Sequence, residues 1–513
     1  MDNTKEIKIG KNTLESLTTS MYDDARFIFR EYVQNSADAI DKAKTNGLLQ
    51  SGNIYITIET DKKRIIIEDD ATGIEKSKIS EYLRNVGMSA KEKGVDKGFR
   101  GIGRLGGLGY CKTLIFETSV KGESEKSIVK WNADKLRSII ADTTKKEQAS
   151  EVINEVTTIE YKSEDINKHY FKVILENVTS DKLLNVKDVR QYLSMVAPVP
   201  FKKSIFSEQI YTELKKDNIK LDEYPIFVNQ DQIFKGYKWY VYDGEENNPR
   251  KVDEVINIEF FKETDKDKIL YWGWYGITEK NQLLKPINFA RGFRLRSKNI
   301  QIGDETTLKE LHRDSRFQNY MFGEIYAINQ ALTPNARRDN FVKDMAEYEE
   351  FSNKIKTFFA TTIYNLCYDA SKVNSAVKDI TAYNTLKTEF EEKQKQGWTD
   401  KVEREKWFVD LDTKKEKAET ASKTIEKLQA KTTDTNQPIV RIIQKATEKI
   451  EEIQPIEAPD IEIKEKPIFR TNKLSKLNKS DQKFLGEIFA IINNVLTKDL
   501  AENLIQKIEE KYK

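Results

Sequence analysis

The first part of the chain changes its hydrophobic period from that of a helix to that of strands. Residues 12–48 are predicted to be helical, most strongly DARFIFREYVQNSADAIDKAK, where apolar positions recur every three or four residues. The next two segments, NIYITIET and KRIIIEDD, alternate between apolar and polar positions and are rich in β-branched residues. This pattern predicts two strands that follow the helical region.

Further strand-like segments occur on both sides of residue 165. TLIFETSV, IVKWNA and EVTTIEYK complete residues 1–165, which we expect to form a sheet covered by helices, an α+β arrangement. A second mixed region is expected over residues 166–345. Its strand-like segments are YKWYVYD, INIEFF, ILYWGWYGI and GFRLRSKNIQI.

From about residue 346 the pattern becomes helical and highly charged. Residues 346–430 have sparse apolar positions among many charges, which is typical of a solvated helix or a coiled coil. Residues 431–470 contain QPIEAPDIEIKEKP, whose prolines indicate a linker. Residues 471–513 predict an amphipathic helix or helical hairpin, whose apolar face must be buried on the body of the protein or on a second copy. That face contains Leu485, Ile488, Ile492, Val495, Leu496, Leu500, Leu504 and Ile508.

Composition removes several classes of protein from consideration. The 513 residues include 86 Lys and Arg against 84 Asp and Glu, so the net charge of +2 gives no overall attraction to nucleic acid or anionic membranes. With only two cysteines and two histidines, a disulfide framework, a thiolate zinc site and a histidine-rich metal centre are excluded. A polar N-terminal segment, and no apolar stretch of about 20 residues, predict a cytoplasmic protein without a membrane span.

Three polar side chains of the first helical region have the spacing of a catalytic face. Glu31, Asn35 and Asp38 are four and three residues apart, which places them on one side of a helix. An amide oxygen suits a hydrated Mg²⁺ ion, and a carboxylate can accept a proton from a water that attacks a phosphoryl group. An ordinary solvated helix face has the same spacing, so the pattern alone leaves both interpretations open.

A second acidic motif ends the second predicted strand. IIIEDDATGI, residues 65–74, places Glu68, Asp69 and Asp70 at the end of a buried-looking strand, and a turn at Gly73 follows. A carboxylate there can accept a hydrogen bond from an exocyclic amine such as that of adenine, and glycine lets the backbone approach a flat ring. An acidic turn between two structural elements is the alternative.

Glycines are concentrated in KGFRGIGRLGGLGYC, residues 97–111. Such a segment exposes backbone N–H groups that can cradle phosphate, whereas a flexible hinge is the alternative. It lacks both a G-x-G-x-x-G motif directly after a first strand and the G-K-[ST] of a P-loop, which disfavours those two kinds of site. The six glycines are Gly98, Gly101, Gly103, Gly106, Gly107 and Gly109.

Taken together and in this order, the three motifs resemble those of the GHKL (Bergerat-fold) ATPase superfamily, which includes Hsp90-type chaperones, MutL-type and MORC-type proteins. REYVQNSADA is similar to the Hsp90-type block E-x-x-x-N-x-x-D-A at every signature position. The resemblance implies that Glu31 is the general base, that Asn35 binds Mg²⁺ and that Asp38 lines the nucleotide pocket. It also implies a Bergerat-type sandwich of helices and a sheet over residues 1–165.

The second motif is assigned by the same resemblance. IEDDATGI is similar to the family block D-x-G-x-G-[IM]. This similarity implies that Asp69 accepts the adenine amine and that Gly73 and Ile74 lie against the nucleotide. Ala71 stands where the family has its first glycine, which is a departure from the block.

The glycine-rich motif resembles the third, phosphate-binding block of the family, although its glycines are spaced one residue further apart. Residues 75–100 correspond to the lid that covers ATP, with Ser89 and Lys91 as candidate phosphate contacts. VTTI, residues 156–159, occupies the place of a late pocket strand and implies a role for Thr157. The glycines implied to contact nucleotide are Gly101, Gly103, Gly106, Gly107 and Gly109.

The second region resembles the middle domain of Hsp90, an α/β domain with a ribosomal-S5-like fold. GFRLRSKNIQIGD and GEIYAINQALTPNARRDNF correspond to a strand pair followed by a loop that sends an arginine to the γ-phosphate of ATP. Aligned on Leu332, Asn335 and Asp339, that arginine is Arg338, and Arg337 is the second choice. A surface arginine paired with Asp339 is the alternative.

The resemblance implies an ATP- and Mg²⁺-dependent enzyme that couples closure of a homodimer to work on a protein partner. Two other functions stay open from the sequence. One is an ATP-gated DNA clamp like MORC or MutL proteins, with a role in genome defence, and the other is a nucleotide sensor without significant turnover. The last third of the chain shows no resemblance to the client-binding and dimerisation domain of Hsp90.

Overall fold

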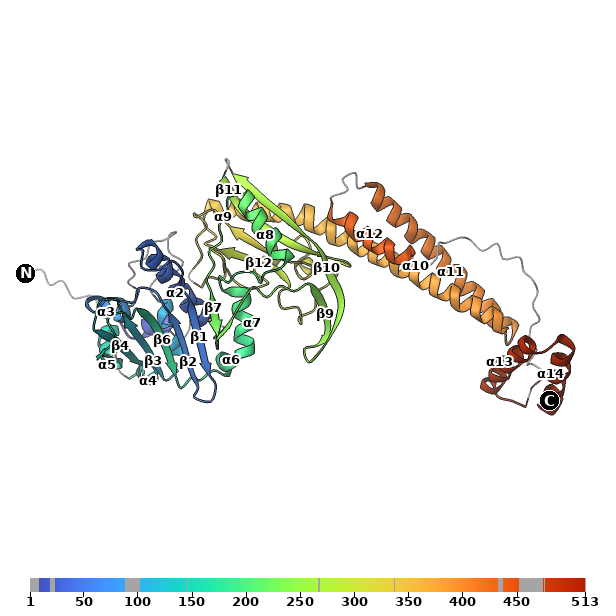
Figure 1. Ribbon diagram of the computed structural model, residues 1–513, viewed down its shortest axis with the longest axis horizontal. Coiled ribbons are helices and arrows are strands. Elements are labelled where there is room, and N and C mark those ends of the chain that lie inside the picture. The colour runs from blue at the N-terminus through green and yellow to red at the C-terminus, as the bar shows by residue number, and fades with distance from the viewer. Residues whose placement is uncertain are drawn as a thin grey trace, which may run out of the picture. The chain divides into compact units, whose positions relative to one another are not determined.

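The computed structural model describes residues 9–18, 24–87, 102–144, 146–265, 268–335, 337–431, 437–451, 474 and 476–512. The chain forms two compact units. The first comprises Met1–Val252, Ile258–Gly276 and Leu283–Thr361, and the second comprises Asp253–Asn257, Ile277–Gln282 and Thr362–Lys513. Figure 1 shows their helices and strands in chain order from blue to red. The mixed helix and sheet architecture with helical C-terminal elements confirms the predicted α+β class.

The first unit begins with an eight-stranded sheet in the order β5-β4-β3-β6-β2-β1-β7-β8. Neighbouring strands are antiparallel except for the parallel pair β1 and β7. The strands are β1 (Ile54–Glu59), β2 (Arg64–Asp69), β3 (Thr113–Ser119), β4 (Glu125–Asn132), β5 (Thr157–Ser163), β6 (Tyr170–Glu176), β7 (Ile226–Val228) and β8 (Asp231–Gln232). The segments predicted as β1 to β5 are thereby confirmed.

Helices pack on one face of this sheet because its strands alternate. In β1 the side chains of Ile54, Ile56 and Ile58 are buried, while Tyr55 on the other face is exposed. The apolar face joins one continuous core with the covering helices. Those elements are α1 (Asn12–Thr18), α2 (Phe27–Thr45), α3 (Ile79–Arg84), η2 (Gly103–Gly109), α4 (Ala133–Ala141), α5 (Ala149–Val156), α6 (Asp181–Leu184) and α7 (Val186–Val196). The short helix η1 (Lys76–Lys78), which has no buried residue, precedes α3.

The domain boundary expected at residue 165 falls inside this sheet. β6 lies between β3 and β2 and pairs with both, so the centre of the sheet is built from residues beyond the boundary. Buried residues of α7 and β7, such as Val189 and Ile226, belong to the same core. The structural layer that contains the first three motifs therefore extends to β8.

A second, six-stranded sheet has the order β13-β12-β14-β11-β10-β9. β12 and β14 are parallel, whereas β11 and β14 are antiparallel. Its elements and their neighbours are α8 (Ile205–Lys216), β9 (Tyr240–Glu245), β10 (Asn248–Asp265), β11 (Lys268–Thr278), β12 (Gly292–Ser297), β13 (Ile300–Gln301), η3 (Lys309–Leu311), η4 (Ser315–Asn319), β14 (Phe322–Ala327) and α9 (Ala346–Phe358). The four strand segments predicted for this region are confirmed.

A fully buried group of charges ties this second sheet to the first part of the unit. The Glu324 carboxylate on β14 accepts a hydrogen bond from Arg296 Nε on β12 and one from Lys235 Nζ at 3.1 Å, and all three side chains are inaccessible to solvent. Arg296 also donates to the carbonyl of Met195 at the end of α7, 2.5 Å away. Because Lys235 follows β8, the group links elements that border both sheets.

The second unit contains the helices α10 (Tyr364–Gln396), α11 (Lys401–Lys431), α12 (Pro438–Glu451), α13 (Lys479–Val495) and α14 (Lys498–Tyr512). The short π-helix η5 (Phe359–Ile363), which begins in the first unit, directly precedes α10. The charged helical region and the terminal helical hairpin are confirmed as helices. The expected linker 431–470 is not all linker, because α12 lies within it. Ile442 and Ile443 of α12 are buried, and Pro438 occupies the first helical position, where its missing N–H is not needed. Among the helices of the described ranges, none is both long and apolar enough to cross a bilayer.

Substitution Glu324→Ala tests the buried charge group. It removes the carboxylate that faces two buried cations, so we expect the free energy of unfolding to fall by about 3–5 kcal/mol. Urea denaturation followed by tryptophan fluorescence measures this change. The matched control is Glu125→Ala, which breaks an exposed pair with Lys76 and should leave the denaturation midpoint unchanged. Equal midpoints for the two variants would contradict a structural role for the group.

Candidate active site

Helix α2 carries the first predicted constellation and is fixed by its apolar side. Ile28, Phe29 and Val33 are at most 1% exposed and pack into the core. The polar residues Glu31 and Asp38 are also buried, each 8% exposed, and Asn35 is half-buried. Carboxylates this far from water are seldom found without a partner or a function. The interpretation of this face as an ordinary solvated one is therefore disfavoured.

The carboxylate of Glu31 lies between two guanidinium groups. Its Oε1 is 3.6 Å from Arg338 Nε, which comes from the loop after β14, and 3.7 Å from Arg30 Nη2 on the same helix. Both distances are those of ion pairs rather than hydrogen bonds, and Oε1 has no hydrogen-bond partner in the described part of the chain. The charge of Glu31 is thus balanced while this oxygen remains able to accept a proton or a hydrogen bond.

The loop that carries Arg338 is held in an unusual conformation. Arg338 has φ +55°, in the left-handed region that disfavours side chains other than glycine, asparagine and aspartate. Its N–H donates to the carbonyl of Asn335 at 3.2 Å, and its carbonyl accepts from the N–H of Gly303 at 2.8 Å. Arg30 of α2 donates to the carbonyl of Arg337 at 3.1 Å. These contacts turn the Arg338 side chain toward Glu31.

Of the two candidate arginines, the structure brings Arg338 to Glu31. The Arg337 side chain is exposed and lines a separate cavity. The alternative in which the arginine pairs with Asp339 has no support from the loop, where Asp339 accepts a hydrogen bond from Asn335 Nδ2 at 2.5 Å.

The glycine-rich motif approaches Glu31 through Gly103. A Cβ atom at Gly103 would lie 2.2 Å from Glu31 Oε2, so a side chain there would displace the carboxylate. Gly106 and Gly107 are buried and Gly109 is half-buried in η2. Gly101, Ser89 and Lys91 lie outside the described residues, as does the expected lid from residue 88 to 100.

Tyr32 is a residue of this site that the sequence analysis missed. Its hydroxyl donates to the carbonyl of Arg104 at 3.1 Å and accepts from the N–H of Gly107 at 3.0 Å. The ring belongs to α2 and is 1% exposed. Tyr32 therefore ties the glycine segment to the helix of Glu31. Its position directly after Glu31 gave no signal, because a tyrosine on a helix most often contributes only to the core.

The two neighbouring carboxylates at the end of β2 have different environments. Asp70 accepts from the N–H of Asn53 at 2.7 Å and from its Nδ2 at 2.8 Å, so it stabilises the turn before β1. Asp69 is 1% exposed and accepts from the N–H of Ala71 at 3.2 Å and from the Ser36 hydroxyl of α2. Burial raises the pKa of Asp69 to about 7 despite these donors. Asp69 is thus a buried carboxylate beside α2, and its role toward adenine stays a prediction.

The turn after Asp69 is shaped by Gly73. It has φ +68°, and a Cβ atom there would lie 2.0 Å from the carbonyl oxygen of Ser119 on β3. The N–H of Ile74 donates to Thr118 Oγ1 at 2.9 Å, which fixes the turn against the sheet. Ala71, the departure from the family block, is buried and does not have a positive φ, so alanine fits this position.

Comparison with known proteins identifies the segment that contains α2, Asp69 and the glycine-rich motif. Residues 25–165 match the family model described as "Histidine kinase-, DNA gyrase B-, and HSP90-like ATPase". Residues 25–165 are a GHKL ATPase domain. The chain is similar over part of its length to proteins named chaperone protein HtpG. It is 33% identical over 130 residues to that of Alkaliphilus metalliredigens, which covers 23% of this chain and 21% of the relative.

Two further relatives of the same name match this chain with similar identity and coverage. The protein of Buchnera aphidicola is 28% identical over 172 residues, or 29% of this chain and 28% of the relative. The protein of Shewanella sp. (strain ANA-3) is 27% identical over 163 residues, or 28% of this chain and 26% of the relative. The matches thus span less than a third of the length of these relatives. They confirm the Hsp90-like resemblance of the GHKL domain.

The last predicted pocket residue has structural partners within the GHKL domain. The Thr157 hydroxyl donates to the carbonyl of Ile153 on α5 at 2.7 Å and accepts from Arg84 Nε on α3 at 3.0 Å. It thereby joins two helices that cover the sheet, and its role toward nucleotide stays a prediction.

The GHKL domain has features that fit Mg²⁺·ATP. Gly103 leaves free the space that a side chain would fill beside Glu31, and Asp69 offers a buried acceptor. The amide oxygen of Asn35, one turn from Glu31, is the kind of hard ligand that Mg²⁺ takes beside phosphate and water. In the ranges that the structure describes, no group of three or more His, Cys, Asp or Glu side chains is arranged to hold a metal ion.

Substitution Tyr32→Phe tests the link between α2 and the glycine segment. It leaves the buried N–H of Gly107 unpaired, which should cost about 1–3 kcal/mol of stability and weaken ADP binding about fivefold to tenfold. Isothermal titration calorimetry measures the affinity and thermal unfolding the stability. Tyr55→Phe, on the exposed face of the sheet, is the matched control. Unchanged ADP affinity in Tyr32→Phe would contradict the role assigned to the hydroxyl.

The raised pKa of Asp69 predicts a pH dependence of nucleotide binding. The ionised carboxylate is the better acceptor for an amine, so ADP affinity should rise with pH and level off above about pH 7. Below that pH the affinity should fall by up to about tenfold per pH unit in addition to the titration of ADP itself. Glu125→Gln, at an exposed carboxylate paired with Lys76, should keep the wild-type profile, whereas Asp69→Asn should lose the Asp69 contribution. Superimposable profiles for Asp69→Asn and wild type would refute the assignment.

Proposed function

We propose that the protein hydrolyses ATP and uses the nucleotide to close its GHKL domain against the region that carries Arg338. The observation that carries this proposal is the 3.6 Å contact between Glu31 and Arg338. A carboxylate on α2 and an arginine from the loop after β14 meet in one buried place, although the sequence separates them widely. Such a pairing of a base and a cation is the minimum set for attack of water on a γ-phosphate.

In the proposed reaction, the γ-phosphate of ATP takes the guanidinium of Arg338 from Glu31. The guanidinium then balances the charge that develops on the phosphoryl oxygens, for which its planar fork is suited. Oε1 of Glu31, which has no hydrogen bond in the described part of the chain, orients a water and accepts its proton. The adenine amine is bound by Asp69. A Mg²⁺ ion held by Asn35 and the phosphates would neutralise phosphate charge.

The contacts of the Arg338 loop suggest how nucleotide binding would change the conformation of the protein. Arg30 of α2 donates to the carbonyls of Arg337 and Arg338, and Gly303 after β13 donates to Arg338. A shift of Arg338 toward phosphate therefore pulls on both α2 and the second sheet. This supports a cycle in which the nucleotide state is converted into the position of one sheet relative to the other.

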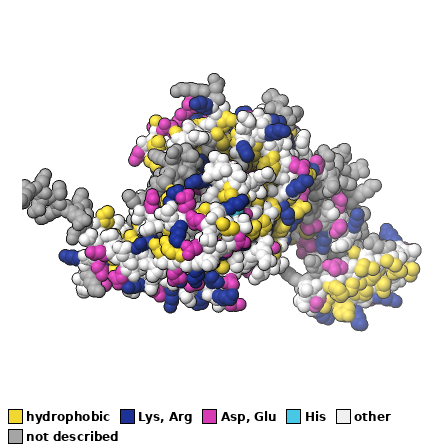
Figure 2. Space-filling model, turned by 60° about the vertical axis from the view of Figure 1, so that its left-hand side comes forward, with side chains coloured by type: hydrophobic (Ala, Val, Ile, Leu, Met, Phe, Trp, Pro, Cys, Tyr) yellow, Lys and Arg dark blue, Asp and Glu magenta, His cyan; other side chains and the backbone are white. Residues whose placement is uncertain are grey.

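We also propose a homodimer that acts on a protein partner in the cytoplasm. The relatives are named chaperones, and the terminal hairpin exposes a wide apolar surface, which Figure 2 shows as gathered yellow side chains. Phe484, Ile491 and Val495 of α13 and Leu500 of α14 are each at least 60% exposed. A second copy of the hairpin would cover this surface.

Steady-state ATP hydrolysis by three variants tests the proposed function. Glu31→Ala should lower kcat at least about 100-fold while ADP still binds, and Arg338→Ala should lower it about 1,000-fold. The control Arg316→Ala, which breaks an exposed pair with Asp314, should keep the wild-type rate. A larger loss in Arg337→Ala than in Arg338→Ala would reverse the assignment of the two arginines.

The same assay separates the other functions. Stimulation of wild-type turnover by double-stranded DNA, lost at higher salt, would favour a DNA clamp over a protein remodeller. Nucleotide binding without measurable hydrolysis would favour a sensor. Activity that persists in Glu31→Ala would overturn the proposed mechanism.

A further inference from the structure

Arg104 lies in the glycine-rich motif and has no counter-charge among the described residues. It directly follows Gly103, the glycine at which a Cβ atom would touch the Glu31 carboxylate. The Arg104 side chain is half-buried, and burial lowers the pKa of its guanidinium to about 10. Burial is the only cause of this shift, so no carboxylate of the described residues lies near enough to oppose it.

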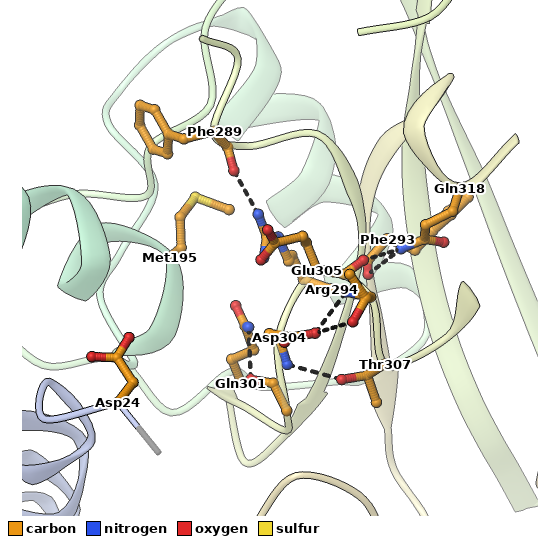
Figure 3. Close-up of polar contacts among 12 residues, drawn as sticks. Asp24, Met195, Phe289, Phe293, Arg294, Gln301, Asp304, Glu305, Thr307 and Gln318 are labelled. Atoms are coloured by element: carbon orange, nitrogen blue, oxygen red, sulfur yellow. Dashed lines mark hydrogen bonds and ion pairs between the residues drawn. The ribbon is translucent and has the colours of Figure 1, made fainter. Parts of the chain in front are cut away.

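Three other arginines of the first unit are buried, and each of them has a carboxylate partner. The pairs are Arg30 with Glu31, Arg294 with Glu305 and Arg296 with Glu324. Figure 3 shows the second pair, in which Arg294 reaches both Glu305 and the carbonyl of Phe289. A guanidinium withdrawn from water is unfavourable unless an anion balances its charge. Since Arg104 lacks such a partner in the described part of the chain, we expect its counter-charge to come from a ligand.

The contacts of Arg104 leave one side of its guanidinium open to a ligand. Nη2 donates to the carbonyl of Asn85, the C-cap residue of α3, and the Arg104 carbonyl accepts from the Tyr32 hydroxyl at 3.1 Å. Nε has no solvent-accessible surface and is closed to a ligand. Nη1, by contrast, has no hydrogen-bond partner among the described residues and retains accessible surface. A ligand can therefore bind the guanidinium through Nη1.

We propose that Arg104 binds an oxygen of the α- or β-phosphate of the nucleotide through Nη1. The assignment rests on the proposed function, in which the γ-phosphate lies between Glu31 and Arg338. Gly103 keeps the glycine segment beside Glu31, whereas the Arg104 side chain extends to the end of α3. The inner phosphates, rather than the γ-phosphate, are therefore its partners. A guanidinium forms charge-assisted hydrogen bonds with phosphate oxygens, so the nucleotide supplies the missing counter-charge.

Isothermal titration calorimetry of the full chain with adenosine, AMP and ADP tests this contact. Arg104→Met removes the cation but keeps an unbranched side chain, so ADP should bind at least about tenfold more weakly, while adenosine should bind as it does to the wild type. Arg104→Lys keeps the charge without the planar fork and should recover part of the loss. A loss that is already present with AMP assigns the α-phosphate, and one that appears only with ADP assigns the β-phosphate.

Arg137→Met is the matched control, because Arg137 also contacts the glycine segment but has a carboxylate partner. It donates to the carbonyls of Leu108 and Cys111 and pairs with Asp134. Without nucleotide, Arg137→Met should lower the midpoint of thermal unfolding, whereas Arg104→Met should keep or raise it, because it removes a half-buried charge that has no partner. The ratio of ADP affinity to adenosine affinity should fall in Arg104→Met and stay at the wild-type value in Arg137→Met.

The outcomes separate the role of Arg104 from the proposed function. Wild-type protein that binds no ADP would refute the proposed function and the role of Arg104 with it. If the wild type binds ADP and Arg104→Met keeps the wild-type ratio of ADP to adenosine affinity, the assignment of Arg104 alone is overturned. An equal fall of this ratio in Arg137→Met would also overturn it, because loosening of the glycine segment rather than loss of the cation would then be the cause.

Discussion

The arrangement of the first unit depends on one buried carboxylate and the two guanidinium groups beside it. Glu31 is held away from water, and an isolated charge in such a place would be strongly unfavourable. Arg30 supplies one counter-charge from the same helix, and Arg338 supplies the other from a loop that follows the second sheet. The helix that carries the proposed base therefore needs the distant loop to be in place. The charge balance of Glu31 therefore depends on the loop that follows the second sheet.

A second buried group of charges also links elements that border the two sheets of the first unit. Glu324 is shared by Arg296 and Lys235, and burial together with Arg296 lowers the pKa of Lys235 to about 7, although the carboxylate acts against this shift. Arg296 reaches the end of α7. Buried ion pairs contribute little net stability when they form, but breaking them is costly, so such groups favour one arrangement over many. Apolar packing alone would allow the two sheets to slide.

The sequence predicted those parts of the fold that local periodicity determines. The alternation in 53–70 and the helical spacing around Glu31 are sufficient to predict β1, β2 and α2. The family motif singles out Asp69 rather than Asp70, and the two carboxylates do have different hydrogen-bond partners. The sequence did not reveal Tyr32 or Arg30, because their roles come from backbone groups of Arg104, Gly107 and Arg337 that only folding brings near. The place of β6 was missed for the same reason. Strand order depends on long-range pairing, which local patterns do not reveal. The boundary at residue 165 was placed after the last recognised motif and therefore excluded β6.

The place of β6 has a consequence for how the chain is made. During synthesis, β1 and β2 leave the ribosome as one hairpin, and β3 to β5 leave as a separate meander. Neither piece can join the other until β6 emerges, because it hydrogen-bonds to β2 on one side and to β3 on the other. Until then both pieces present open strand edges, which are sites of mispairing with other chains. The nascent protein is therefore most vulnerable after β5 has been translated and before β6 emerges between the two pieces.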